Sequence, residues 1–225
     1  MLTWARYHVR RLAYRSDVLR PIVEQHAQAL DSADWDQHLA TDKITYLGGT
    51  VAIDARNSLI STLAKHYGSE QPSVLDVGCA GGSLAASIDH RGYLGTDISN
   101  VAIARARLHY GELPLTQFQV SSLEEFSFSG RSWDVIVLGE VLYYMSVGKA
   151  ADQVARYSRA LASGGLICIS MKDDGKSQQI FRLLHFLTLH EAILMQAKTR
   201  IDCLEYRIRI NRERPAYLIA AFSGS

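Results

Sequence analysis

The stretch that most constrains the fold of this chain is a glycine-rich turn between an apolar run and a helical pattern. Val74 to Val77 is apolar except for Asp76, which is the pattern of a buried parallel strand. Three glycines within Gly78 to Gly82 predict a tight turn, and the residues from Ser83 onward have helical spacing. Glycine lets the backbone approach a ligand, and a helix that follows directs N–H groups and positive dipole at an anionic part of it. The sequence therefore predicts a ligand site at the carboxyl end of this strand.

The spacing of the glycines narrows the class of ligand. A dinucleotide fingerprint would place glycines two and five residues beyond Gly78, where the chain has Ala80 and Ser83. No Lys-Ser or Lys-Thr follows the turn, so it is not a Walker phosphate loop. An acidic residue in the strand followed by Gly-x-x-Gly-Gly resembles instead the first motif of the class I S-adenosylmethionine-dependent methyltransferases. A glycine turn with another ligand or with none stays the alternative.

A second carboxylate favours a ligand that contains a ribose. Asp97 ends the apolar stretch that begins at Tyr93 and lies 19 residues beyond Gly78. At that distance the next strand of a doubly wound sheet delivers an acidic residue to the ribose hydroxyls. The alternative is a cap for the helix from Val101, but Ser99 and Asn100 can cap that helix without Asp97.

Length, charge and cysteine content set the broad class. With 225 residues and 48% hydrophobic residues, the chain has enough apolar material for one packed core with additions. The net charge of +1 gives no overall field for nucleic acid. Three widely spaced cysteines, Cys79, Cys168 and Cys203, predict neither a disulfide framework nor a metal site. This cysteine content suits a reducing cytoplasm, where the protein is expected, and no apolar run has the length of a membrane span or the form of a secretory signal.

The first 70 residues are expected to form a helical extension, or lid, before a Rossmann-like domain at 71–225. Its first twenty residues carry five arginines against Asp17, a basic patch that offers a weak peripheral contact with anionic lipid or is simply a solvated helix face. A short helical segment is predicted to begin at Asp31 to Asp34, and a helix at Ala52 to Tyr67. Tyr46 and Arg56 are candidate ligand contacts, with core packing and a surface salt bridge as the alternatives.

Two more strands are predicted in the middle of the chain. A helix from Val101 to Tyr110 precedes a short strand at Thr116 to Val120, and Trp133 to Gly139 is a buried strand. The latter runs into Glu140, Tyr143 and Tyr144, so a carboxylate and two phenols come to the carboxyl end of a strand beside the central crossover, where a substrate should meet the ligand.

The last third of the chain completes the predicted sheet. A helix from Lys149 to Leu161 should end at Gly164-Gly165, before a strand at Leu166 to Met171 that brings Lys172, Asp173 and Asp174 to the same rim. The two aspartates are weak evidence for Mg²⁺, and no metal site is predicted. A long helix at Ser177 to Gln196 and a hairpin of two antiparallel strands at 201–210 and 216–222 follow.

These stretches together resemble a class I methyltransferase over about residues 70 to 222. The resemblance implies an α/β fold with a doubly wound, mostly parallel seven-stranded sheet and an antiparallel last strand, and S-adenosylmethionine as cosubstrate. Family members often bind adenine through an acid after the third strand, where this chain has Ser122 and the backbone of Leu123. The cosubstrate contacts implied are Asp76, Gly78, Cys79, Ala80, Gly81, Gly82, Asp97, Ile98, Ser122, Leu123 and Glu140.

The subfamily most similar to this chain is the nodulation-protein S type. The run from Asp134 to Met145 and the Gly78-Cys79-Ala80 turn carry that similarity. Those enzymes methylate the amino group of a glucosamine at the end of a chito-oligosaccharide. The expected reaction is therefore methyl transfer to an amine or hydroxyl of a small molecule or saccharide.

The residues expected to act on the acceptor follow the fourth strand and the fifth. Glu140 and Tyr144 are the predicted catalytic residues, and Tyr143, Tyr144 and Lys172 are the predicted acceptor contacts. For Glu140, a role in holding the glycine turn or the cosubstrate amine is an equal alternative. A protein or nucleic-acid methyltransferase and an inactive cosubstrate-binding regulator remain alternatives, although an Asn-Pro-Pro-Tyr base-flipping motif is absent after the fourth strand.

Overall fold

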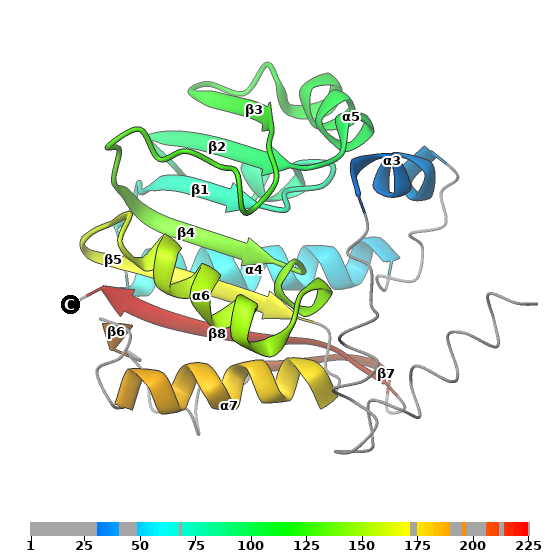
Figure 1. Ribbon diagram of the computed structural model, residues 1–225. Coiled ribbons are helices and arrows are strands. Elements are labelled where there is room, and N and C mark those ends of the chain that lie inside the picture. Colours follow the sequence, from blue (N-terminus) through cyan, green and yellow to red (C-terminus); the bar gives the residue numbers. More distant parts are fainter. Residues whose placement is uncertain are drawn as a thin grey trace, which may run out of the picture.

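A single mixed sheet forms the centre of the molecule (Figure 1). The structure is a computed structural model in which residues 31–40, 49–67, 69–171, 175–189, 195–196, 206–211 and 214–224 are described. The strands are β1 (Ser73–Val77), β2 (Gly92–Asp97), β3 (Thr116–Val120), β4 (Trp133–Gly139), β5 (Leu161–Met171), β6 (Met195–Gln196), β7 (Tyr206–Asn211) and β8 (Arg214–Gly224). Their order is β3-β2-β1-β4-β5-β8-β6, and β7 pairs with β8 outside this path.

The predicted doubly wound sheet with an antiparallel last strand is confirmed. Strands β1 to β5 pair in parallel, and β8 runs antiparallel to β5 from Leu166↔Ser223 to Met171↔Leu218. The described residues contain eight strands instead of the seven predicted, because both β6 and β7 pair with β8. The predicted C-terminal hairpin is confirmed as the β7–β8 pair.

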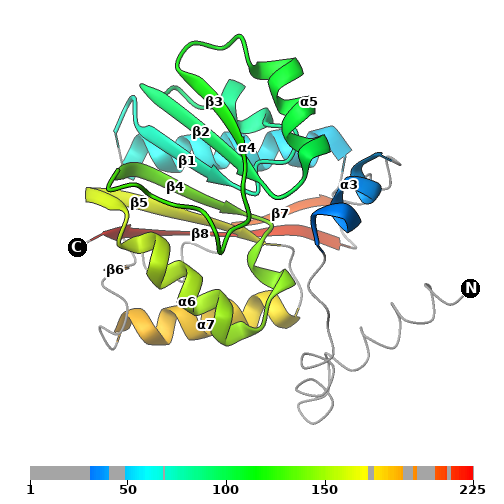
Figure 2. The same cartoon turned by 45° about the horizontal axis from the view of Figure 1, so that its top comes forward.

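Helices cover both faces of the sheet (Figures 1 and 2). Helices α4 (Gly49–Tyr67) and α5 (Asn100–Tyr110) pack on one face, and α6 (Val147–Ser158) and α7 (Gly175–Leu189) pack on the other. A further helix, α3 (Ser32–Ala40), lies beside α5 at the end where the parallel strands terminate. No helix among the described residues has the length and apolarity to cross a membrane.

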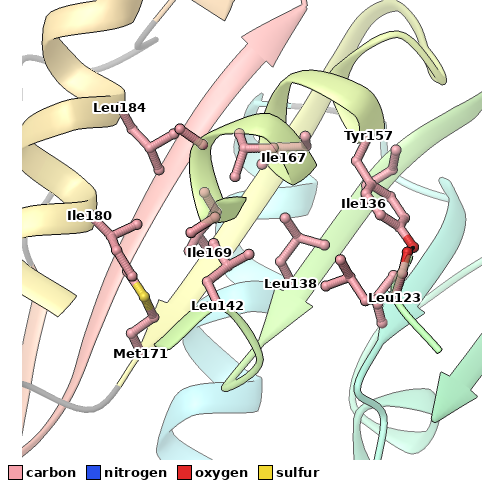
Figure 3. Close-up of a cluster of buried hydrophobic side chains, with 14 of the residues drawn as sticks. Leu123, Ile136, Leu138, Leu142, Tyr157, Ile167, Ile169, Met171, Ile180 and Leu184 are labelled. Atoms are coloured by element: carbon pink, nitrogen blue, oxygen red, sulfur yellow. Dashed lines mark hydrogen bonds between the residues drawn. The ribbon is translucent and has the colours of Figure 1, made fainter. Parts of the chain in front are cut away.

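The α6–α7 face holds the larger apolar core (Figure 3). Alternate residues of the central strands point into it, and Ile136, Leu138, Ile167 and Ile169 are each 0% exposed. Burying a side chain of this size stabilises the fold by about 1.5–3 kcal/mol. The intervening residues of the same strands enter a second core beneath α4 and α5. Because strands buried on both faces read as continuous apolar runs, the central strands were recognisable in the sequence.

The segment after the glycine turn differs from the prediction. The residues after Gly82 form only a four-residue 3₁₀ helix, η2 (Ser83–Ala86). Strand β2 begins six residues later at Gly92, and Ile88 turns into the core, which leaves no room for further helical turns. The predicted helix dipole is therefore absent, and the turn can bind a ligand only through its own backbone groups.

Two element boundaries later in the chain also differ. Helix α6 ends at Ser158, and Gly164 and Gly165 lie inside β5 instead of stopping the helix. A Cβ added at Gly165 would lie 2.8 Å from the carbonyl oxygen of Ala162, at a place where the pairing of β4 with β5 shifts its register. These glycines therefore allow the irregular backbone at the start of β5. The predicted helix to Gln196 ends at Leu189, and Met195–Gln196 is a strand.

Candidate functional site

The glycine turn connects β1 to η2 at the carboxyl edge of the sheet. The N–H groups of Gly78 and Cys79 both donate to the carbonyl oxygen of Thr96 on β2, at 2.8 and 3.0 Å. Gly78 and Gly82 have φ angles of +76° and +79°, which favour glycine. A Cβ at Gly78 would lie 2.2 Å from Cγ1 of Val141, so the turn packs tightly on the segment after β4.

Gly81 differs from the other two glycines. A Cβ added there would meet no heavy atom within 4 Å, so its backbone faces open space. The thiol of Cys79, by contrast, is buried beside Gly95, and burial raises the pKa of that thiol well above its usual value. Only the backbone of Cys79 is therefore available to a ligand.

Asp97 joins the turn to the end of β2. Its carboxylate accepts a hydrogen bond from the N–H of Ala80 at 3.0 Å and another from the N–H of Ser99 at 2.9 Å. Burial raises the pKa of Asp97, and these two bonds oppose the rise. A carboxylate has about four acceptor positions, so Asp97 keeps acceptor capacity for hydroxyl groups. The capping role proposed as the alternative belongs to Ser99, whose hydroxyl accepts from the N–H of Ala102.

Helix α3 brings a group to this corner that the sequence did not reveal. Asp36 accepts hydrogen bonds from the hydroxyl of Ser99 at 2.5 Å and from the N–H of Val101 at 3.1 Å. The bond from Ser99 is the main cause that lowers the pKa of Asp36. The preceding residue, Trp35, meets the ring of Tyr144 edge-on with centroids 4.8 Å apart. Helix α3 therefore contacts both the start of α5, next to Asp97, and the segment after β4.

The segment after β4 carries Glu140 and two tyrosines, and the structure brings the two phenols together. Glu140 is 8% exposed and has a φ of +60°, and its N–H donates to the carbonyl oxygen of Ser170. The rings of Tyr143 and Tyr144 lie 4.5 Å apart in the 3₁₀ helix η3 (Leu142–Tyr144), with their hydroxyls 3.3 Å apart. A positive φ outside glycine costs of order 1–3 kcal/mol and is concentrated at ligand sites. Lys172, Asp173, Asp174 and Tyr46 lie outside the described residues.

A buried carboxylate and a guanidinium lie beneath the turn on the α4 side. Asp76 is 4% exposed and accepts a hydrogen bond from the hydroxyl of Tyr93 at 2.5 Å. Burial raises its pKa from the usual 3.8 to about 6, although that bond and the charge of Arg56 both lower it. Arg56 Nη1 and Ser170 Oγ lie 3.9 and 3.8 Å from the position that a Cβ on Gly139 would take. Arg56, named as a candidate from the sequence, therefore lies at the ends of the central strands.

The segment after β3 offers less than the sequence indicated. The hydroxyl of Ser122 donates to Glu125 at 2.9 Å and accepts from the N–H of the same residue. The carbonyl oxygen of Leu123 accepts from Arg156 at 2.8 Å and from Tyr157 at 3.0 Å, the second of which is drawn in Figure 3. For these residues, the N–H of Leu123 and the remaining lone pair of Ser122 are the groups left for a ligand.

A sequence-family model described as a methyltransferase domain matches residues 74–165. Together with the sheet order described above, this match gives the chain the fold of a class I methyltransferase. That match spans the glycine turn, Asp97, the β4 segment and the start of β5, which are the parts described above.

Two curated relatives match part of this chain. A protein of Geobacillus sp. (strain WCH70), provisionally named a methyltransferase, is 28% identical over 145 residues, which are 62% of this chain and 59% of that protein. The ubiquinone biosynthesis O-methyltransferase of Alkalilimnicola ehrlichii is 31% identical over 121 residues, which are 52% of this chain and 48% of that protein. The chain thus spans about half the length of these relatives.

Two solved structures share the fold of this chain. One is the N-methyltransferase NodS from Bradyrhizobium japonicum WM9 in complex with S-adenosyl-L-homocysteine, with a TM-score of 0.66, 19% identity, and coverage of 86% of this chain and 97% of that one. The other is magnesium protoporphyrin IX methyltransferase from Synechocystis PCC 6803 with bound S-adenosylmethionine, with a TM-score of 0.62, 15% identity, and coverage of 88% and 99%. At these identities the likeness is one of fold.

Proposed function

We propose that this chain transfers the methyl group of S-adenosylmethionine to an amine or hydroxyl of a small molecule or saccharide. The observation that carries the proposal is the hydrogen bond between Ala80 and Asp97, which holds a carboxylate with spare acceptor positions beside the open backbone of Gly81. A ribose needs two acceptors close together, and the rest of a nucleoside needs backbone that it can approach. The bound ligands of the two structures with this fold support the same choice.

The two ends of the cosubstrate are assigned by charge and position. We place the ribose at Asp97 and the adenine beside Ile98, with Ser122 and the N–H of Leu123 as its polar contacts. The methionyl end carries an ammonium and a carboxylate, and it is matched by the Asp76 carboxylate and the Arg56 guanidinium on the α4 side. The pKa of about 6 leaves Asp76 ionised at neutral pH, as a cationic partner requires.

The reaction is an in-line displacement at the methyl carbon. The nucleophile forms a bond to that carbon while the carbon–sulfur bond breaks, the sulfur keeps the electron pair, and S-adenosylhomocysteine is released. The protein contributes mainly by holding the nucleophile, carbon and sulfur in line. Glu140 takes the proton of the nucleophile or orients it, and Tyr143 and Tyr144 contact the acceptor. Lys172 remains a predicted acceptor contact outside the described residues.

Binding and transfer are tested separately. Calorimetry should detect S-adenosylhomocysteine binding to the purified chain, and Asp97→Ala should weaken that binding by about 1.5–3 kcal/mol for each hydrogen bond lost. Asp89→Ala, which removes an exposed carboxylate from the η2–β2 loop, is the matched control. Unchanged affinity in a folded Asp97→Ala protein would remove Asp97 from the site.

Transfer is followed with methyl-labelled S-adenosylmethionine and fractionated metabolites and glycans, with the labelled product identified by mass spectrometry. A labelled amine or alcohol supports the proposed acceptor class. Label found in protein or nucleic acid would contradict that acceptor class and identify a macromolecular acceptor instead. Tight binding without transfer to any fraction would instead make the chain a cosubstrate-binding regulator.

A further inference from the structure

Asn57 is a buried amide in the middle of α4 that joins two parts of the site. It is 1% exposed, and its Nδ2 donates to the hydroxyl of Ser83 at 2.9 Å. Ser83 is the first residue after the glycine turn. The Oδ1 of Asn57 accepts from Nε and Nη2 of Arg56, at 3.3 and 3.1 Å. The amide of Asn57 therefore contacts both the residue that follows the turn and the Arg56 guanidinium at the strand ends.

The two bonds from Arg56 fix the direction of its guanidinium. This group is planar, so engaging Nε and Nη2 along one edge decides where Nη1 points. Nη1 lies 3.9 Å from the Cβ position of Gly139, at the carboxyl end of β4. Without the amide, a long arginine side chain on a helix would have several rotamers, of which only some reach the strand ends.

The surroundings of Nη1 are polar in a place where the rest of the sheet is apolar. Asp76 on β1 lies close enough for its charge to interact with that of Arg56. Ser170 on β5 is 0% exposed, and among the described residues its hydroxyl has no hydrogen-bond partner. A guanidinium, a carboxylate and a hydroxyl without a described partner at one corner suit a zwitterionic ligand group. A role in apolar packing would not explain these polar groups.

An asparagine at this position is costly unless it has such a role. Asparagine is a weak helix former, and a buried amide is tolerated only when its polar atoms are bonded. A leucine would give α4 more helix propensity and more apolar burial. The bonds of Asn57 run to the two neighbours of the proposed ligand, Arg56 and the turn, and these bonds supply the reason for its presence.

We propose that Asn57 is a positioning residue, which turns Arg56 toward the methionyl carboxylate of the cosubstrate, while the bond from its Nδ2 to Ser83 holds the amide in place. This inference rests on the proposed function and deepens it. It assigns to the N-terminal part of the chain the recognition of the amino-acid end of the cosubstrate, while the turn and Asp97 recognise the nucleoside.

The test compares two ligands that differ only at that end. S-Adenosylhomocysteine and 5′-methylthioadenosine share adenine, ribose and sulfur, but the second lacks the carboxylate and ammonium. Asn57→Ala should weaken S-adenosylhomocysteine binding by about ten- to a hundredfold and leave methylthioadenosine binding unchanged. Ser58→Ala, an exposed neighbour on α4, is the control and should change neither affinity. Equal weakening of both ligands would overturn the inference, because a general loss of structure does not distinguish them.

A double-mutant cycle tests whether Asn57 acts through Arg56. Arg56→Gln combined with Asn57→Ala should bind S-adenosylhomocysteine no more weakly than Arg56→Gln alone. Independent losses that add would overturn the inference. If Asn57→Ala does not fold, Asn57→Asp keeps an acceptor for Arg56, adds a negative charge to it and loses the donor to Ser83. It should then retain more of the discrimination between the two ligands than Arg56→Gln, and no difference between these variants would count against the inference.

A failure of the proposed function gives a different result. Wild-type protein that binds neither ligand would contradict the methyltransferase proposal as a whole. In another outcome, the wild-type protein binds S-adenosylhomocysteine more tightly than methylthioadenosine, and Asn57→Ala has the same affinities as wild type for both ligands. That result would leave the methyltransferase proposal standing and reject the role of Asn57.

Discussion

At the scale of single residues, neighbouring glycines of the turn have different roles. Gly82 has a positive φ, and a Cβ there would lie 2.7 Å from Phe118, whereas a Cβ on Gly81 would meet nothing within 4 Å. Gly82→Ala should therefore lower the free energy of unfolding by roughly 1–3 kcal/mol. Gly81→Ala should unfold like the wild type but bind S-adenosylhomocysteine on the order of tenfold more weakly, because the methyl occupies space meant for the ligand. Thermal denaturation and calorimetry on the pair check this, and normal binding by Gly81→Ala would mean that the ligand does not approach that backbone.

Glu140 can be separated into a chemical role and a supporting one. Glu140→Gln keeps the size and the positive φ but removes the basic lone pair. A base should then lose about 10²- to 10⁴-fold in kcat with little change in cosubstrate affinity. If Glu140 instead holds the turn or the cosubstrate amine, affinity should fall first. Single-turnover rates on a verified acceptor, together with S-adenosylhomocysteine titrations, distinguish the two, and full-speed transfer by the variant leaves positioning as the explanation.

Only some residues of the candidate site were accessible from the sequence. Gly78, Asp97 and Glu140 could be named as candidates because each follows or ends an apolar run at a known place in a doubly wound sheet. Asp36 was not, because its bond to Ser99 spans 63 residues and no periodicity links a short helix to a distant helix start. Asn57 was missed for the same reason, since a polar residue inside a helical pattern reads as a solvated position.

At the scale of elements, α6 fixes the segment that we assign to adenine. Arg156 donates to the carbonyl oxygens of both Leu123 and Phe126, and its guanidinium lies 5.0 Å from the centroid of the Phe128 ring. The Tyr157 hydroxyl donates to Leu123 as well, and burial raises the pKa of Tyr157 to about 12, so this group stays protonated. The 122–126 turn is therefore held from behind by one helix.

Removing this support should loosen the turn. Arg156→Gln cannot span both carbonyls and loses at least one charge-assisted hydrogen bond, at a cost of about 1.5–3 kcal/mol in the free energy of unfolding. Affinity for adenosine should fall together with that for S-adenosylhomocysteine, because both use the adenine contacts. Arg159→Gln, an exposed arginine one residue beyond the end of α6, is the control. Urea denaturation and adenosine titrations test the pair, and unchanged adenosine binding in Arg156→Gln would separate the turn from adenine.

The accuracy of the predicted elements follows from how each one is specified. Strands β3 and β4 were predicted at their observed bounds, since each is a compact apolar or alternating run between polar turns. The prediction of a regular helix after the glycine turn was wrong, because the helical spacing of the residues holds for one turn only, before Ile88 enters the core. The glycine pair at 164 and 165 has the composition of a helix stop, but pairing with β4 places it inside a strand. Tertiary contacts decide such cases, and one sequence does not contain them.

At the scale of the whole molecule, two apolar cores hold a sheet whose carboxyl edge gathers the polar groups. Asp76 belongs to that edge and is the acid most deeply buried beneath the turn. Its pKa is raised from 3.8 to about 6, so the unfolded chain releases this proton at a lower pH than the folded chain does. Asp76 therefore favours the folded state below about pH 4, and this contribution is lost as the pH rises through about 6. The groups that face it are Tyr93, Arg56, Asp97 and Cys79.

Replacing Asp76 by Asn removes this titration and keeps an acceptor for the Tyr93 hydroxyl. Near pH 7.5 the variant should gain up to about 3 kcal/mol in the free energy of unfolding relative to wild type, since two pKa units correspond to that energy. The gain should vanish near pH 4. Because other groups titrate alike in both proteins, their effect cancels when the wild-type free energy of unfolding is subtracted from that of the variant. Urea denaturation at both pH values measures it, and an equal difference at the two would contradict the assignment. S-Adenosylhomocysteine should bind the stabilised variant more weakly, because the amide of asparagine is neutral and cannot attract the methionyl ammonium as the Asp76 carboxylate does.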